Sequence, residues 1–198
     1  MNYFIYAETA FHHEGDINYL LDLVNLTKEC NYEGIKFQVI GELSSYMVRR
    51  HSQYKMIEKM ILSMDEWKKV IVYAKSLNLK VIFMPLDLVS INWAIKHSDL
   101  VDYIDIHSVS FYDQPLLAKI KELQKPIILG VGGRTLDEIE SAFSYFGEQI
   151  SVLMHGFQSF PTELTNARLL RIPALKKLYP NVLVGYADHS PFESEDSV

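Results

Sequence analysis

Seven short runs of apolar and β-branched residues recur along the chain, and helical periodicity fills the segments between them. The first two runs are residues 3–8 and 34–39, and a helical pattern at 16–31 joins them. Two neighbouring strands that are joined through one helix run parallel. The first 39 residues therefore predict a βαβ unit, and the repetition of the pattern predicts an α/β fold.

The same alternation continues to the end of the chain. We predict strands at 80–86, 102–108, 125–133, 150–156 and 181–189, and helices at 64–78, 89–97, 113–123, 136–146 and 163–179, the last one kinked at Pro173. Residues 41–63 are too long for a simple loop, so we expect a partly helical insertion over the rim, of the kind that acts as a lid.

No G-x-G-x-x-G motif follows the first strand, which favours a TIM-type (β/α) barrel over an open dinucleotide-binding sheet. About seven strands are visible where a closed barrel has eight. We therefore expect an incomplete barrel that forms a single domain over residues 1–198. An unclosed barrel exposes strand edges, so we expect a homo-oligomer or a partner subunit that covers the gap.

Composition excludes several classes of function. Acidic residues outnumber basic ones by 25 to 19, giving a net charge of −6, so a nucleic-acid surface is not expected. Cys30 is the single cysteine, which rules out an internal disulfide and fits a reducing compartment. No apolar run approaches the ~20 residues that cross a bilayer, and no membrane contact is expected. These features predict a cytoplasmic protein.

Three polar side chains lie where the first two predicted strands end. Glu8 closes the first strand, and Lys36 and Gln38 lie two apart on the second, so they face the same side. A lysine at a barrel mouth can hold a phosphate or carboxylate. A carboxylate there can act as a base, orient a sugar hydroxyl or bind a metal. A solvent-exposed lysine and a surface salt bridge are the alternative readings of the same residues.

A glycine-rich turn follows the run at 125–133. Gly130, Gly132 and Gly133 precede Arg134, and Thr135 begins a T-x-x-E capping box. Glycines before a helix let backbone N–H groups approach an anion, and Arg134 adds charge. A tight strand-to-helix turn explains the same residues equally well.

Histidines recur at the ends of the predicted strands. Together with Glu8 and Asp188 they could form a divalent-metal site, although no pair has the H-x-x-x-H spacing of a helical zinc motif. A hydrogen-bonded structural role is the alternative for each one. The histidines concerned are His12, His13, His107, His155 and His189.

Five segments, taken in order, resemble the sialic acid synthases, the N-acetylneuraminate synthase family. The chain is similar to a divergent and truncated member of that family, and the likeness covers nearly its whole length. The segments are AETAFHHEG (7–15), GIKFQ (34–38), KPIILGVGGRTLDEIE (125–140), MHGFQSFPT (154–162) and VGYADHS (184–190).

The resemblance implies a TIM-barrel transferase of sialic acid and carbohydrate biosynthesis. Such an enzyme condenses phosphoenolpyruvate with an N-acetylhexosamine of the N-acetylmannosamine type, giving a nonulosonic acid and phosphate, with Mn or Mg as the divalent metal. It implies catalytic roles for Glu8, Lys36 and Asp188, and a metal-binding role for His189. The implied substrate-binding residues are Gln38, Ser108, Gly130, Gly132, Arg134, Gln158 and Thr162.

The chain also departs from the family pattern. The strand-four lysine aligns with Asp105, the strand-five Ser/Thr with Gly130, and the Ser of S-D-H with Ala187. The family's C-terminal antifreeze-like domain is absent from the 198 residues. A second hypothesis is therefore a catalytically inactive, synthase-like binding or regulatory subunit that needs a partner. A third is a barrel lyase or aldolase that uses His107 or His155 as acid or base.

Overall fold

The computed structural model describes residues 3–156, 159 and 161–190. Contacts divide the chain into two compact units: residues 1–105 with 112–125 form the first, and residues 106–111 with 126–198 form the second. The single domain expected over residues 1–198 stays a prediction.

The first unit carries a parallel sheet in which consecutive strands are neighbours. Its strands are β1 (Tyr6–Glu8), β2 (Gly34–Val39), β3 (Lys80–Pro85) and β4 (Tyr103–Ile106), the last without Ile106, which belongs to the second unit. The central strand β3 is buried from its second residue onward. Burial on both faces explains why its sequence reads as a continuous apolar run rather than as an alternating one.

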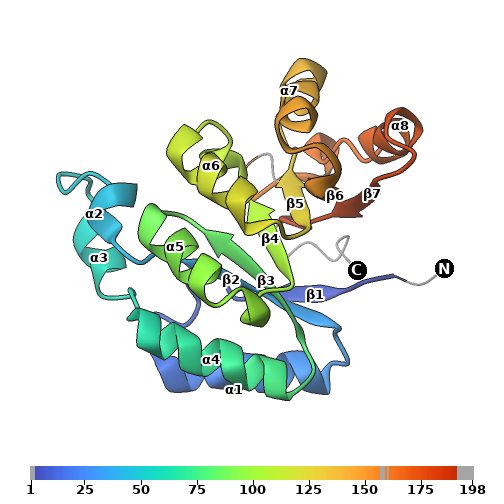
Figure 1. The fold of residues 1–198 in the computed structure, drawn as a ribbon. Coiled ribbons are helices and arrows are strands. Elements are labelled where there is room, and N and C mark those ends of the chain that lie inside the picture. Colours follow the sequence, from blue (N-terminus) through green and yellow to red (C-terminus); the bar gives the residue numbers. More distant parts are fainter. Residues whose placement is uncertain (1–2, 157–158, 160, 191–198) are drawn as a thin grey trace. The chain divides into compact units, whose positions relative to one another are not determined.

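Four helices accompany this sheet: α1 (Ile17–Glu29), α4 (Met64–Ser76), α5 (Leu88–Lys96) and α6 (Gln114–Leu123). Figure 1 shows α1 and α4 lying side by side. Leu20 and Val24 of α1, and Trp67 and Val70 of α4, are buried. Their 3–4-residue spacing places them on one helical stripe, as the periodicity predicted.

The second unit contains the parallel strands β5 (Ile127–Gly130), β6 (Ile150–His155) and β7 (Leu183–Tyr186), with helices α7 (Leu136–Phe146) and α8 (Arg171–Leu178). Helix α8 begins eight residues later than predicted, after a 3-10 turn at Leu164–Asn166. The predicted kink at Pro173 is wrong. Pro173 is the third helical residue, where the missing N–H has no intrahelical partner and does not interrupt the helix.

Seven parallel strands alternating with helices confirm the predicted α/β fold and its description as an incomplete TIM-type barrel. The strand boundaries are narrower than expected at several ends, and β1 begins at Tyr6 rather than at residue 3. Within the described part of the chain, every helix is too short or too polar to span a membrane.

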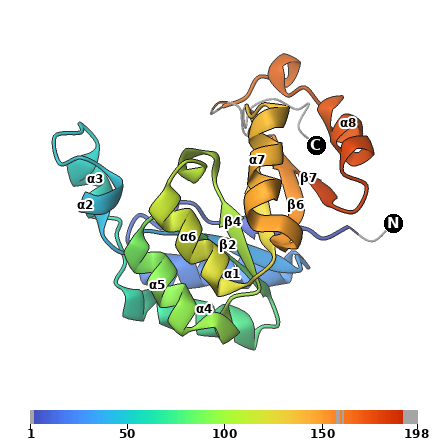
Figure 2. The same ribbon diagram turned by 45° about the horizontal axis from the view of Figure 1, so that its top comes forward.

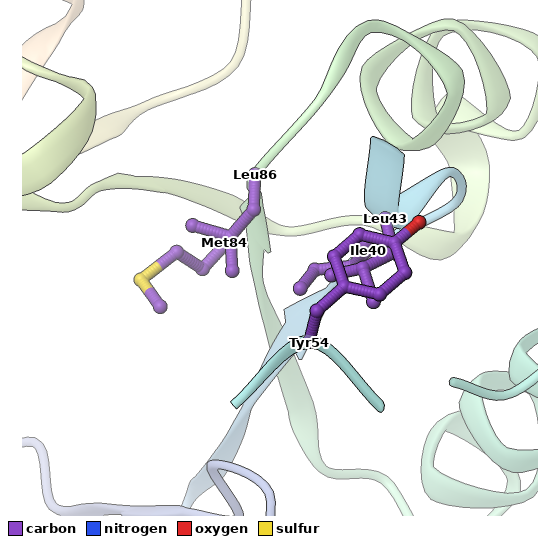
Figure 3. Close-up of a cluster of buried hydrophobic side chains, with 5 residues drawn as sticks. All are labelled: Ile40, Leu43, Tyr54, Met84 and Leu86. Atoms are coloured by element: carbon purple, nitrogen blue, oxygen red, sulfur yellow. The ribbon is translucent and has the colours of Figure 1, made fainter. Parts of the chain in front are cut away.

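The insertion at 41–63 is partly helical, as predicted, with α2 (Leu43–Tyr46) and α3 (Tyr54–Glu58). Figure 2 shows these helices projecting beyond α5. An apolar cluster packs the insertion against residues at the ends of β2 and β3. The buried members are Ile40, Leu43, Tyr54, Met84 and Leu86 (Figure 3). A lid motion would have to separate this cluster.

Asp87 fixes the start of the insertion. Its Oδ2 accepts hydrogen bonds from the backbone N–H of Gly41 at 2.7 Å and of Glu42 at 2.6 Å. Its Oδ1 accepts from the N–H of Ser90 at 2.7 Å, which caps α5. One buried carboxylate therefore holds both the insertion and a helix N-terminus.

Candidate functional site

Lys36 lies between two carboxylates in the first unit. Its Nζ is 2.8 Å from Glu8 Oε2 and 3.3 Å from Asp105 Oδ2. The Gln38 side-chain amide donates a hydrogen bond to Glu8 Oε1. We call Glu8, Lys36, Gln38 and Asp105 the ion cluster. The predicted grouping of Glu8, Lys36 and Gln38 is observed, and Asp105 is an addition.

Strand register explains how these side chains meet. Glu8 pairs with Lys36 across β1 and β2, and Lys36 pairs with Ile82, which in turn pairs with Tyr103 of β4. Aligned residues of a parallel sheet share a face, and so do residues two apart on a strand. Gln38 and Asp105 therefore occupy the next layer toward the C-terminal ends of their strands, and the long Lys36 side chain reaches up to Asp105.

Burial strengthens the electrostatic interactions within the ion cluster. Lys36 is 5% exposed and Asp105 is 4% exposed. Burial tends to lower the pKa of Lys36, but the carboxylates of Asp105 and Glu8 outweigh it and the pKa is raised. Lys36 is therefore an ammonium group at neutral pH. The alternative reading of Lys36 as a solvent-exposed rim lysine is wrong.

The partners of Lys36 respond to the same environment. Burial raises the pKa of Asp105, and Lys36 partly opposes this shift. Burial also raises the pKa of the Tyr6 hydroxyl, and the charge of Asp105 reinforces the effect. Tyr6 therefore remains a neutral phenol. Because Lys36 stays protonated, it is suited to binding a negative charge and unsuited to acting as a nucleophile that forms a Schiff base.

A pocket of ≈ 340 Å³ lies beside β1 and α1 in the same unit. Glu8 and His12 line it together with mostly apolar or small side chains: Ala7, Thr9, Tyr19, Leu23, Leu26, Thr27, Cys30 and Tyr32. Glu8 is thus the member of the ion cluster that borders this pocket.

In the second unit, the glycine turn and Arg134 form a packed structure. Arg134 Nη2 donates to the Ser108 carbonyl at 2.6 Å, Nη1 lies 3.2 Å from Glu138 Oε1, and the guanidinium is 4.7 Å from the centre of the Phe111 ring. A Cβ added at Gly130 would lie 3.1 Å from the Ile106 carbonyl oxygen. A side chain at Gly130 would therefore require that backbone to shift slightly, which favours the structural reading of this glycine. Gly132 is buried in the same turn.

The loops after β6 and β7 meet through backbone contacts. The N–H of buried Thr162 donates to the His189 carbonyl at 2.6 Å. Asp188 is exposed, and hydrogen bonding from the Ser190 backbone lowers its pKa. His189 Nδ1 lies 3.1 Å from the Ala187 carbonyl oxygen. The predicted substrate residue Gln158 lies outside the described residues.

The histidines are held by local contacts within each unit. His13 is buried beside Trp67, and His155 is buried with Nε2 2.8 Å from the Ala167 carbonyl oxygen. His107 Nδ1 accepts a hydrogen bond from the Val109 N–H. Over residues 3–156, 159 and 161–190, no three His, Cys, Asp or Glu side chains are grouped to hold a metal ion. The divalent-metal site expected from histidines together with Glu8 and Asp188 stays a prediction, since these histidines are divided between the two units.

His13 should make stability depend on pH. It is 1% exposed, its Nδ1 accepts the Gly15 N–H at 3.1 Å, and burial lowers its pKa from the usual 6.5. The unfolded chain therefore binds more protons than the folded chain as the pH falls below 6.5, and stability falls with it. His13→Phe should flatten the urea-unfolding free energy between pH 5 and 7. An unchanged slope in that variant would contradict this assignment.

Comparison with known proteins shows which family of proteins this chain resembles. A model described as the NeuB family matches residues 23–195. An uncharacterized protein of Methanocaldococcus jannaschii is 31% identical over 190 residues, covering 94% of this chain and 55% of the relative. The N,N'-diacetyllegionaminic acid synthase of Campylobacter jejuni is 27% identical over 204 residues, covering 94% of this chain and 60% of the relative.

The solved structures agree with the sequence comparison. An N-acetylneuraminic acid (sialic acid) synthetase from Leptospira borgpetersenii, in complex with citrate, superposes with a TM-score of 0.84 at 25% identity. The match covers 94% of this chain and 65% of that one. The chain spans 55% and 60% of the two curated relatives above, so little more than half of each protein is represented here.

Proposed function

The chain belongs to the NeuB family, and from this we propose that it is a synthase domain that condenses phosphoenolpyruvate with an N-acetylated amino sugar. The acceptor would be of the N-acetylmannosamine type, the products a nonulosonic acid and phosphate, and the location the cytoplasm. One observation carries the proposal: Glu8, the last residue of β1, meets Lys36 and Gln38 of the adjacent parallel strand β2, and Gln38 lies near the C-terminal end of that strand. Barrel enzymes place their catalytic groups at that end.

Each of these residues has a role that its chemistry supports. Lys36 stays protonated, so its ammonium would bind the phosphate or carboxylate of phosphoenolpyruvate. Glu8 would accept a proton or a hydrogen bond from water or a sugar hydroxyl. Gln38 donates to Glu8 and would hold that carboxylate in one orientation.

A divalent Mn or Mg ion is part of the proposal, with His189 as a ligand and Asp188 beside it. Such an ion would polarise the sugar aldehyde as a Lewis acid. The described residues around His189 supply too few donors for a complete coordination shell. We therefore derive no step of the reaction through the metal. Arg134, Ser108, Gly130, Gly132, Gln158 and Thr162 remain proposed substrate contacts.

A second candidate function is a synthase-like binding or regulatory subunit without turnover, acting with a partner or as a homo-oligomer. The pairing of Asp105 with Lys36 favours it. With both carboxylates ionised, the ion cluster carries two negative charges and one positive charge. This net negative charge does not attract phosphoenolpyruvate, which is a trianion. The lyase or aldolase alternative through His155 receives no support, because that imidazole is fully buried and bound to a backbone carbonyl.

The test is product formation. The purified chain is incubated with phosphoenolpyruvate, N-acetylmannosamine and Mn²⁺, while phosphate release and the mass of the sugar product are followed. Glu8→Gln should reduce turnover by about 100-fold, because general acid–base groups typically contribute that much or more.

Glu29→Gln provides the matched control, since Glu29 is exposed at the end of α1 and the same charge is removed. The control should keep wild-type turnover. Absence of product in the wild-type chain would reject the synthase proposal for this polypeptide and favour the binding subunit.

A further inference from the structure

We propose that Asp105 sets the affinity of the ion cluster for anionic substrates, because its carboxylate competes with the substrate's phosphate or carboxylate for the Lys36 ammonium. The inference rests on the proposed function in one respect, namely that the substrate's negative charge binds at Lys36. It gives Asp105 a role in substrate specificity and predicts that its carboxylate weakens the binding of anions.

Lys36 has a limited number of hydrogen-bond donors for a substrate anion. An ammonium group has three N–H donors and no acceptor. Lys36 lies within 3.3 Å of carboxylate oxygens of both Glu8 and Asp105. Two of its three donors are therefore directed to carboxylates of the protein, and a substrate anion must share or replace one of these contacts.

The two carboxylates occupy different positions relative to Lys36. Asp105 lies in the layer of side chains above Lys36, toward the C-terminal ends of the strands, whereas Glu8 is in register with Lys36 itself. A ligand that enters from the C-terminal ends meets Asp105 before it reaches Lys36. The Asp105 contact is also the longer of the two, at 3.3 Å against 2.8 Å for Glu8. The longer contact makes Asp105 the carboxylate that a substrate anion would replace more easily, although the Glu8 side chain is the more exposed of the two, at 26% against 5%.

The charge of Asp105 also affects an anion that binds near Lys36. The side chains of Lys36 and Asp105 are only 7% and 5% exposed, so water screens their interactions poorly. Ionised Asp105 repels a phosphate group nearby and also neutralises the cation that should attract it. Burial raises the pKa of Asp105, so both effects weaken as the pH falls. An uncharged sugar experiences neither effect. The ion cluster should therefore bind multiply charged anions weakly and discriminate little against neutral, hydroxyl-rich ligands.

The experiment compares two aspartates that lie three residues apart. Phosphoenolpyruvate and inorganic phosphate, each without metal, are titrated calorimetrically into wild type, Asp105→Asn and Asp102→Asn. Asp102 pairs with Lys75 at 2.6 Å and Lys80 at 3.3 Å, so its substitution removes the same charge from outside the ion cluster.

We expect Asp105→Asn to tighten phosphoenolpyruvate binding by about tenfold or more, since loss of a nearby buried charge is typically worth at least one pKa unit of interaction. Asp102→Asn should change it by no more than about twofold. The affinity for N-acetylmannosamine should stay the same in all three proteins. Asp105→Ser is a second variant that removes the charge with a smaller side chain, in case the amide does not fit.

The outcomes separate this inference from the proposed function. Equal affinities in wild type and both Asp105 variants, an equal gain in Asp102→Asn, or no anion binding in any folded variant would overturn the inference. Tighter binding in Asp105→Asn without any sugar product would leave the inference standing and reject the synthase function.

Discussion

Lys36→Met is expected to lower the free energy of unfolding by about 3–5 kcal/mol, the usual cost of removing one partner from a buried ion pair. The substitution keeps most of the apolar stem but leaves Glu8 and Asp105 close to each other without the ammonium between them. Asp105 is 4% exposed and cannot be hydrated without opening the structure. Urea unfolding at pH 7, followed by circular dichroism, measures the loss.

Two further variants test whether pairing causes this loss. The double variant Lys36→Met, Asp105→Leu should recover much of the stability, because replacing a whole buried pair by apolar residues is often close to neutral. Lys80→Met should cost less than about 1 kcal/mol, since the Lys80 side chain is 56% exposed in its pair with Asp102. Equal losses in the single and double variants would show that Lys36 and Asp105 are not coupled.

Asp87→Ala should lower the free energy of unfolding by about 3 kcal/mol or more. The substitution leaves the N–H groups of Gly41 and Glu42 without their acceptor, and each of these partly buried hydrogen bonds to a charged group is worth about 1.5–3 kcal/mol. It also removes the N-cap of α5, typically worth about 1 kcal/mol. Chemical denaturation measures the total, and hydrogen exchange should show faster exchange at the Gly41 and Glu42 amides.

Asp113→Ala is the matched control for Asp87. Asp113 also caps a helix, α6, but its side chain accepts one backbone bond, from Leu116 at 3.1 Å. Its loss should cost about 1 kcal/mol. Similar losses at the two aspartates would mean that the bonds from Asp87 to the insertion add no stability.

The fold was largely predictable because its elements are encoded locally. The T-x-x-E box at Thr135 is formed, and both the side-chain and backbone bonds are present. Periodicity located the helices and strands because most of them bury one stripe or both faces. The start of α8 was predicted wrongly because residues 163–170 have helix-compatible composition, yet part of this segment is held as a 3-10 turn by contacts such as that between Ala167 and His155.

The candidate site was predictable only in part. The two-residue period of a strand and the shared ends of parallel strands were enough to group Glu8, Lys36 and Gln38. The Asp105 contact joins residues 69 apart in sequence and depends on the register of β4, which the sequence does not reveal. The presence of Asp105 inside the apolar run YIDI nevertheless indicated that a charged side chain lies at this strand. The histidines were harder to interpret, because His13 and His155 make local packing contacts, and the metal site expected from them stays a prediction.

Calorimetric titration of phosphoenolpyruvate into wild type and into the double variant Lys36→Met, Asp105→Leu tests most directly whether the ion cluster is the substrate site. The double variant is suitable because it should remain folded while it lacks the ammonium. We predict binding to the wild-type chain, weak because of Asp105, and no binding to the double variant. Equal affinity in both proteins would place the substrate elsewhere and contradict the assignment of the ion cluster as its binding site.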